Sequence, residues 1–329
     1  MKGHLEIRLL ITGGSGFIGT NAVSYYIGKG ITLLNIDISR PKDESQTPFW
    51  KAVDILNLPN LKKTVLDFNP THVLHLAART DLDEKQSIEE YKVNTIGVEN
   101  LLVALSQCVN LKRVIFTSSM YVCVPGYNPT NYDDFAPHTL YGESKVRTEN
   151  IVKKYNSETF EWVIIRPTSI WGPWFGHPYN DFFHHVAKRT YFNIIGKTAT
   201  KTYGFIGNSI YQIDQIMFCE KKLVNKRVLY IGDYPGLNIN AWAIEIATQF
   251  GIKLIPVPLV IIRFASWFGD FLSIFGIKFP LQSFRFKNMI TDNTISLLRD
   301  TLEIAPQQIY SVKQGVALTL RWLKENENV

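Results

Sequence analysis

The sequence of 329 residues has few cysteines and no long run of one charge. Its three cysteines, Cys108, Cys123 and Cys219, are scattered, which excludes a disulfide framework and is typical of a reducing compartment. Their spacing also predicts no metal site. The net charge of +6 is spread along the chain, so no basic stripe indicates a nucleic-acid partner. No basic segment followed by an apolar core precedes the first strand, so we expect no signal peptide and a cytoplasmic protein.

A clean membrane-spanning run is also lacking, although the segment from Leu254 to Phe279 is rich in Ile, Leu, Phe and Trp. Pro256, Pro258, Arg263 and Asp270 interrupt it, so no stretch of about 20 apolar residues could cross a bilayer. We interpret the segment as buried helices that line a substrate pocket. Peripheral contact with a membrane surface is the alternative.

The first half of the chain alternates short apolar runs with helical periods. This pattern predicts the α/β class, with a Rossmann-type doubly wound parallel sheet. The expected strands are 8–12, 31–37, 72–76, 113–118, 160–166 and 227–231, and the expected helices are 16–29, 57–67, 88–108, 140–156, 211–224, 240–250 and 312–324. Beyond Pro167 the regular pattern ends, and we expect a smaller, mainly helical C-terminal region.

A glycine-rich loop from Gly13 to Gly19 joins the first strand to the first helix. Glycines allow a tight turn and a close approach to a pyrophosphate, and the following helix offers unpaired N–H groups to the phosphates. Asp37 closes the second strand, 18 residues after Gly19. A carboxylate there accepts hydrogen bonds from the ribose hydroxyls and repels a 2′-phosphate, so NAD is favoured over NADP. Arg40 weighs against this choice, because a nearby Arg could accept a phosphate.

Tyr141 and Lys145 are four residues apart on an expected helix, so their side chains project from one face. An ammonium beside a phenol favours the phenolate and lowers the pKa of the Tyr from about 10 towards neutrality. The pair could then remove a proton from an alcohol while a hydride leaves the same carbon. Ser119 ends an expected strand, at the sheet edge where α/β proteins bind ligands.

Further motifs stand in order along the chain. They are Gly13–Gly19, Asp37, Asp54-Ile55, His75-Leu76-Ala77-Ala78, Asn94, Ser118-Ser119, Tyr141-x-x-x-Lys145 and Arg166-Pro167. The set resembles the extended short-chain dehydrogenase/reductases, specifically the NAD-dependent epimerase/dehydratase family that acts on nucleotide sugars. The resemblance covers most of residues 7–175 and is looser beyond.

The resemblance implies a role for each matching residue. Tyr141 would be the acid/base, Lys145 would bind the nicotinamide ribose and tune Tyr141, and Ser119 would hydrogen-bond the reacting hydroxyl. The implied cofactor-binding residues are Gly13, Gly16, Phe17, Ile18, Gly19, Asp37, Asp54, Ile55, Leu76, Ala77, Ala78, Asn94, Tyr141, Lys145, Pro167 and Thr168. The implied substrate-binding residues are Thr80, Ser119, Asn180 and Lys201. Lys201 stands where the family usually has an Arg, and could meet a phosphate only as a point charge.

The resemblance also implies a division of the chain and an assembly. Residues 1–170 with about 208–234 would form the NAD-binding Rossmann domain, and about 171–207 with 235–329 the substrate-binding region. Members often pair through helices of the sheet domain, so a homodimer is expected.

The residues after Ser119 bear on the reaction. Family 4,6-dehydratases place an Asp-Glu pair there, whereas Met120 and Tyr121 supply no carboxylate. We therefore expect a nucleotide-sugar epimerase, acting at C4 by transient oxidation on a nucleotide-diphosphate sugar. The alternative is a dehydrogenase or ketoreductase of a sugar nucleotide or a sterol-like alcohol. A non-catalytic dinucleotide sensor is disfavoured, because it would be expected to lose Tyr141, Lys145 and Ser119.

Overall fold

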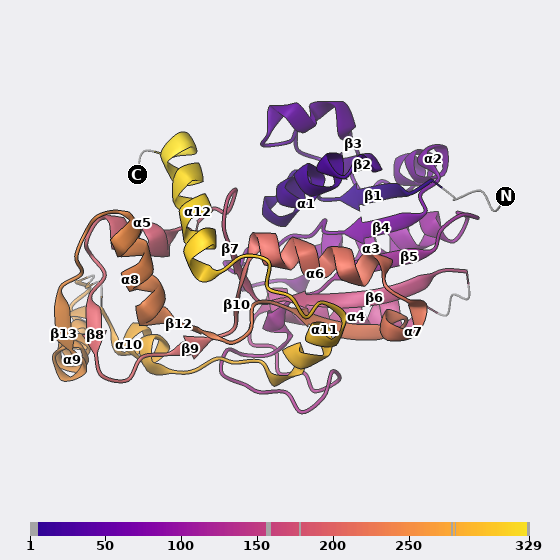
Figure 1. Ribbon diagram of the computed structural model, residues 1–329. Helices are drawn as coiled ribbons and strands as arrows, with labels where there is room; N and C mark the ends of the chain where they lie inside the picture. The colour runs from indigo at the N-terminus through magenta and orange to yellow at the C-terminus, as the bar shows by residue number, and fades with distance from the viewer. Residues whose placement is uncertain (1–5, 156–158, 178, 278, 280, 328–329) are drawn as a thin grey trace.

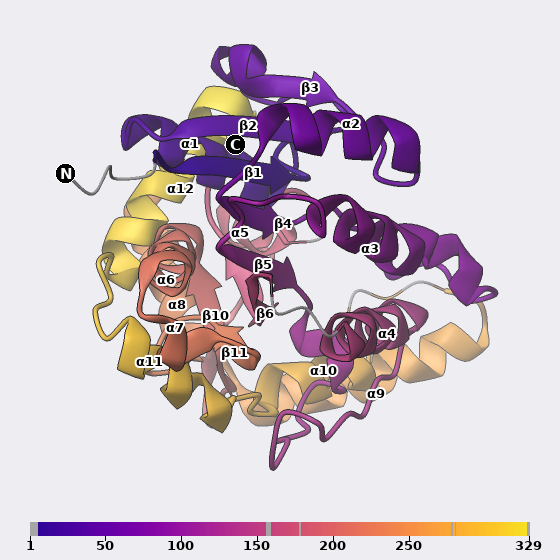
Figure 2. The same cartoon turned by 90° about the vertical axis from the view of Figure 1, so that its right-hand side faces the viewer.

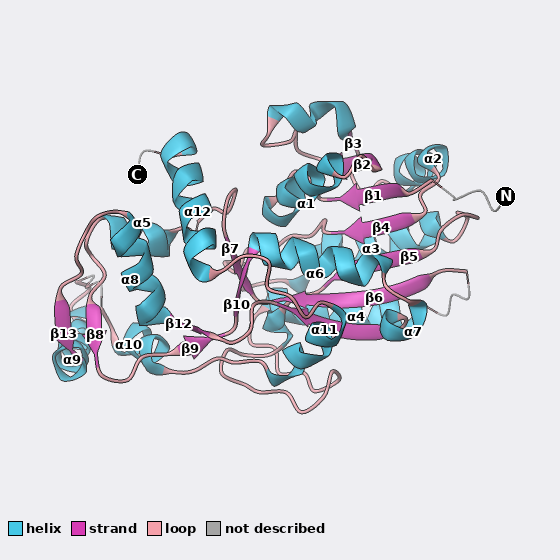
Figure 3. Ribbon diagram, viewed as in Figure 1, coloured by secondary structure: helices cyan, strands magenta, loops and turns pink. Residues whose placement is uncertain are grey.

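The computed structural model describes residues 6–155, 159–177, 179–277, 279 and 281–327. Seven parallel strands form its central sheet in the order β11-β6-β5-β4-β1-β2-β3 (Figures 1 and 3). They are β1 (Arg8–Thr12), β2 (Thr32–Asp37), β3 (Trp50–Ala52), β4 (His72–His75), β5 (Arg113–Thr117), β6 (Glu161–Pro167) and β11 (Arg227–Ile231). The predicted doubly wound α/β fold is confirmed, including the late return of the chain into the sheet at β11.

Helices cover both faces of the sheet (Figure 2). One face carries α2 (Leu58–Phe68), α3 (Lys92–Leu105) and α4 (Leu140–Lys154), and the other carries α1 (Phe17–Gly28) and α6 (Ile206–Phe218). Neighbouring strand residues therefore face opposite cores: Leu9 and Ile11 point into one, and Leu10 into the other. Burial on both faces explains why these strands read as continuous apolar runs.

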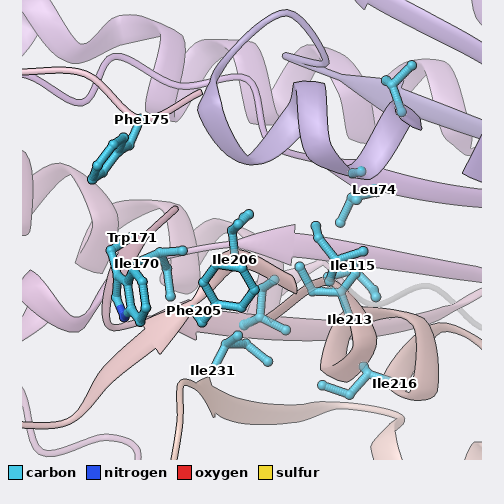
Figure 4. Close-up of a cluster of buried hydrophobic side chains, with 14 of the residues drawn as sticks. Leu74, Ile115, Ile170, Trp171, Phe175, Phe205, Ile206, Ile213, Ile216 and Ile231 are labelled. Atoms are coloured by element: carbon cyan, nitrogen blue, oxygen red, sulfur yellow. The ribbon is translucent and has the colours of Figure 1, made fainter. Parts of the chain in front are cut away.

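The remaining elements lie mostly beyond the carboxyl ends of the strands. They are helices α5 (Asp181–Ala187), α7 (Lys221–Val224), α8 (Ile239–Gln249), α9 (Leu259–Ile274), α10 (Ser283–Ile290), α11 (Arg299–Ile304) and α12 (Val312–Asn326), with the short strands β7 (Ser169–Trp171), β8 (Asn193–Ile195), β9 (Thr200–Lys201), β10 (Tyr203–Phe205), β12 (Leu237–Asn238) and β13 (Pro256–Pro258). Single 3-10 turns are η1 (Glu44–Phe49), η2 (Ile88–Tyr91), η3 (Met120–Val122) and η4 (Ser296–Leu298). A buried cluster joins this region to the sheet: Trp171 and Phe205 belong to the same cluster as Ile115 of β5 and Ile213 of α6 (Figure 4).

Three helix predictions differ from the structure. The helix expected over 88–108 begins with the separate turn η2. The helix expected over 211–224 begins at Ile206, stops at Phe218 and resumes as α7, because Cys219 and Glu220 are extended. The end expected for α4, Asn156, lies outside the described residues.

The interpretation of residues 254–279 as buried helices is wrong. Within α9 only Ile262, Ser266 and Gly269 are buried, because these three positions form the one narrow stripe that faces the protein. The bulky side chains of the helix point outward. None of the helices in the described part of the chain has both the length and the apolarity needed to cross a bilayer.

Candidate active site

A cavity of about 790 Å³ lies along the carboxyl edge of the sheet. It lies between the neighbouring strands β1 and β4, whose following helices, α1 and α3, pack on opposite faces of the sheet. Ligands of open α/β sheets bind at such a point. The cavity is lined by most of the predicted site residues: Gly13, Gly16, Phe17, Ile18, Gly19, Asp37, Asp54, Ile55, Leu76, Ala77, Ala78, Thr80, Ser119, Tyr141, Lys145, Pro167 and Thr168. Asn94, Asn180 and Lys201 do not line it.

The glycine-rich loop forms one end of the cavity. Gly13 has a φ of +72°, and a Cβ there would lie 2.5 Å from the backbone N of Ala77. A Cβ on Gly19 would lie 2.3 Å from the carbonyl oxygen of Gly13, so α1 can begin this close to β1 only without a side chain. The N-terminus of α1, at Gly16, carries no side-chain cap. Its N–H groups are thus available to an anionic group in the cavity.

The carboxylate of Asp37 lies at the end of β2 beside this loop. It accepts hydrogen bonds from the backbone N–H groups of Ser15, at 3.1 Å, and Ser39, at 2.9 Å. Asp54 lines the same part of the cavity and accepts a bond from Leu56 N. Both residues line the cavity, and their contact with the cofactor stays a prediction.

The glycine cradle at Gly13 and Gly19, the uncapped start of α1 and the carboxylate of Asp37 lie together at this end of the cavity. They fit the pyrophosphate and the ribose of an NAD molecule.

Asn94 is buried behind the cavity wall. Its amide oxygen accepts from Arg79 N at 2.9 Å, and its Nδ2 donates to Arg79 O and to Ser144 Oγ, both at 2.9 Å. These bonds tie the loop after β4 to α3 and α4. The structure thus places Asn94 as a support of the cavity wall, although the sequence predicted a cofactor contact.

The predicted catalytic side chains gather at the other end of the cavity. Tyr141 and Lys145 share a face of α4, with Lys145 Nζ 5.9 Å from the centre of the Tyr141 ring. Ser119 forms a side-chain hydrogen bond with Tyr141, and its Oγ also accepts from Tyr121 N at 3.1 Å. The three side chains therefore surround one point at the sheet edge.

The expectation that Lys145 lowers the pKa of Tyr141 is wrong for this structure. Burial raises the pKa of Tyr141 well above 10, and the hydrogen bond with Ser119 opposes the rise only in part. Burial also lowers the pKa of Lys145 to about 8, against the attraction of Glu149. Lys145 Nζ donates to the carbonyl oxygen of Thr117 at 3.0 Å instead of reaching the phenol. Tyr141 is thus protonated at neutral pH.

Glu149, which sequence reasoning missed, continues the face of α4 that carries Tyr141 and Lys145. It holds Arg166 through two bonds of 2.7 and 2.8 Å and accepts from Ser118 Oγ at 2.7 Å. All of these groups are buried, so the pair fixes α4 against β6 directly beneath the site. The spacing of four residues after Lys145 was a usable signal.

The expected phosphate ligands lie away from the cavity. Asn180 begins α5, and its Nδ2 donates to both carboxylate oxygens of Glu327, at 3.2 and 3.3 Å. His184 Nε2 lies 2.9 Å from the same carboxylate. Lys201 lies in β9, and burial lowers its pKa. The substrate end of the cavity instead presents Met120, Tyr121, Ser169, Ile170, Gly176, His177 and Tyr179.

Comparisons with known proteins agree on the family. The model of the NAD dependent epimerase/dehydratase family matches residues 9–209. A 3-beta-hydroxysteroid dehydrogenase of Mycolicibacterium neoaurum is 26% identical over 94% of this chain and 89% of its own length. A UDP-glucose 4-epimerase of Vibrio cholerae is 31% identical over 50% of this chain and 52% of its own length.

Solved structures agree on the fold. The UDP-glucose 4-epimerase of Thermus thermophilus, in complex with NAD, has a TM-score of 0.70 and 20% identity over 97% of this chain and all of its own. A likeness at this level of identity concerns the architecture of the chain.

Proposed function

The chain belongs to the NAD-dependent epimerase/dehydratase family, and we propose that it oxidises a secondary alcohol of an apolar, sterol-like substrate or reduces the matching ketone. The observation that carries this proposal is the position of Glu327. Its carboxylate engages the amide of Asn180, the residue that the sequence resemblance assigns to substrate binding. A negative charge there disfavours a second negative charge.

The lining of the substrate end supports the same substrate class. Apart from Lys145 and Arg79, whose guanidinium is paired with Asp81 and Glu90, it contains aromatic, aliphatic and small polar side chains and His177. A pocket for an apolar ligand has this composition, with a few polar groups that fix its orientation. The match to the steroid dehydrogenase of Mycolicibacterium neoaurum extends over nearly the whole chain and adds to this support.

We assign the following roles in cofactor binding and proton transfer to the residues of the cavity. The loop from Gly13 to Gly19 and Asp37 would hold NAD, which when bound supplies the hydride acceptor or, reduced, the hydride donor. Ser119 would bind the reacting oxygen, and Tyr141 would exchange a proton with it. Because Tyr141 is protonated at neutral pH, it is ready to donate a proton to a ketone oxygen. Oxidation would need Tyr141 to lose that proton first.

A nucleotide-sugar 4-epimerase is the second candidate. It is favoured by the residues that follow Ser119: Met120 lines the cavity with its sulfur 3.9 Å from Ser169 Oγ and cannot transfer a proton, and Cys123 is not among the lining residues. Epimerisation at C4 needs only one proton-transfer group, because the hydride leaves and returns at the same carbon. The likeness to the UDP-glucose 4-epimerase of Vibrio cholerae adds support over half of the chain.

A substrate panel distinguishes the two candidates. The purified protein is incubated with NAD and either a 3-hydroxysteroid or UDP-glucose, and the absorbance of reduced nicotinamide and the products are followed. We expect reduced nicotinamide to form in step with a keto-steroid. Interconversion of UDP-glucose and UDP-galactose without net reduction of NAD would overturn the proposal in favour of the epimerase.

A further inference from the structure

Helix α9 and the chain around it expose an unusual concentration of large apolar side chains. Ten of the 24 exposed large hydrophobic residues in the described chain fall between residues 255 and 277, each 50% to 78% exposed. They are Ile255, Val260, Ile261, Phe264, Trp267, Phe268, Phe271, Ile274, Phe275 and Ile277. Soluble surfaces carry such side chains singly, and a contiguous group indicates an interaction surface.

The two sides of α9 have the reverse of the usual arrangement for a surface helix. Ile262, Ser266 and Gly269 face the protein, and two of these three are small. A Cβ on Gly269 would lie 1.9 Å from the carbonyl oxygen of Leu281, so the helix rests closely on the chain that leads into α10. The small residues thus allow the helix to pack closely on the protein, while the side chains of Phe264, Phe268 and their neighbours are exposed to solvent.

The surroundings of the helix are basic. The sequence from 250 to 290 contains five Lys and Arg residues and a single acidic residue, Asp270. The Asp270 carboxylate is engaged, because it accepts a hydrogen bond from Ser283 N at 3.1 Å. The guanidinium of Arg263 stacks over the ring of Trp267, 5.0 Å from its centre. Aromatic and aliphatic side chains flanked by cations are the composition of helices that lie in the interface of a bilayer with anionic lipids.

We propose that the outward face of α9 docks on the surface of a lipid bilayer that contains anionic lipids. The helix has 16 residues, or about 24 Å, and the hydrocarbon core is about 30 Å thick, so α9 lies in the interface and does not span it. The large aromatic side chains enter the region between headgroups and acyl chains, and Lys253, Arg263 and Lys287 meet the lipid phosphates.

The position of α9 relates the docked surface to the active site. The strands of the sheet point toward the end of the molecule where α9 lies (Figure 1). The active-site cavity lies along that carboxyl edge. Docking therefore turns the substrate end of the enzyme toward the bilayer, where an apolar alcohol would be dissolved. The docking inference itself rests on α9 and not on the identity of the substrate.

Vesicle flotation tests the proposal. The full chain is mixed with vesicles of phosphatidylcholine alone or with a third of phosphatidylglycerol, and the floated fraction is measured. We expect the protein to float with the anionic vesicles and at least tenfold less with the neutral ones. The variant Phe264→Gln/Phe268→Gln/Phe271→Gln is expected to lose at least tenfold in partitioning to anionic vesicles. The matched control Ile96→Gln/Val103→Gln/Val109→Gln removes three exposed apolar side chains elsewhere and is expected to float as the wild type does.

The outcomes separate a bilayer from a second copy of the chain. Failure of the wild type to float, or equal flotation of the α9 variant, overturns the proposal. If the wild type does not float but forms a dimer in vesicle-free buffer, and the α9 variant is monomeric, the exposed face of α9 binds a second copy of the chain and the proposal is also overturned. Circular dichroism and NAD binding of each variant establish that it is folded. Loss of flotation with steroid turnover in solution intact supports docking and leaves the proposed function untouched.

Discussion

The sheet domain and the helical region beyond it differ in the burial of their apolar side chains. In the sheet domain, Leu9, Leu10 and Ile11 are successive residues of β1, and all three are fully buried because helices cover both faces. In α9, Phe264 and Phe268 belong to an equally apolar run and lie mostly in solvent. In the sheet domain, helices of the same chain cover the apolar strands. In the helical region, the apolar face of α9 stays exposed, and the proposed contact with a lipid bilayer explains this arrangement.

The largest expected effect tests whether the chemistry belongs to the sheet domain alone. Tyr141→Phe removes the proposed proton donor and is expected to lower kcat by at least about 100-fold, the usual contribution of a general acid or base. NAD binding, measured by quenching of protein fluorescence, is expected to stay within about twofold. The control Tyr179→Phe removes a hydroxyl that lines the cavity from the other region, and is expected to cost less than tenfold. Equal losses in both variants would contradict the assignment.

A second prediction concerns the buried network beneath the site. Glu149→Gln leaves the guanidinium of Arg166 buried without its carboxylate, and breaking a buried pair from one side costs about 3–5 kcal/mol. The free energy of unfolding in denaturant measures this loss. The control Glu143→Gln breaks an exposed pair with Arg147 on the same helix, and is expected to cost less than about 0.5 kcal/mol. A Glu149 variant as stable as the Glu143 variant would show that the network does not hold α4 to β6.

The sequence allowed the sheet domain to be predicted almost completely, for physical reasons that particular residues illustrate. Strands β1, β5, β6 and β11 are buried on both faces, so their apolar runs are continuous, and the turn at Gly13 has no room for a side chain. Spacing on one helix also brought Tyr141 and Lys145 together. These rules act over short stretches of chain, where sequence patterns are informative.

What the sequence could not supply depends on contacts between distant segments. Asn180 and Glu327 meet across 147 residues, so nothing near Asn180 indicated that its amide is already engaged. The raised pKa of Tyr141 follows from burial by the whole site, which outweighs the hydrogen bond with Ser119. In α9 the apolar run was plain, but only the packing of Gly269 on Leu281 decides which side faces out.

Acid titration gives a third prediction, again specific to the sheet domain. Burial lowers the pKa of His75 to about 3 and that of His72 to about 4, from 6.5. Below pH 6.5 the two histidines therefore bind protons in the unfolded chain but stay neutral in the folded chain. The stability present above pH 6.5 is lost as the pH falls toward 4. Between pH 6 and 5 the two imidazoles together should cost about 2 kcal/mol. Thermal unfolding across this range measures the slope.

The variant His75→Asn isolates one of the two groups. Its amide stands at the position of Nδ1 and can replace the hydrogen bond of 2.7 Å between His75 Nδ1 and Thr12 Oγ1 without titrating. We expect the dependence of stability on pH between 6 and 5 to fall by roughly half. An unchanged slope would mean that other groups, carboxylates included, cause the acid loss.

The smallest expected effect tests the substrate side of the comparison. Glu327→Gln removes the carboxylate that faces Asn180 and His184. A charge at a partly exposed position is worth up to about 1 kcal/mol, or about fivefold in affinity. An uncharged sterol-like alcohol has no electrostatic interaction with this charge, so its KM should stay within about twofold.

The control Glu325→Gln removes an exposed carboxylate close to Glu327 in the sequence and should change neither substrate's KM. A nucleotide sugar brings two negative charges of its own, so removal of the repelling carboxylate should lower its KM several-fold in the Glu327 variant alone. An unchanged KM for the nucleotide sugar would mean that Glu327 does not discriminate against a diphosphate, and would remove the observation on which the apolar substrate class rests.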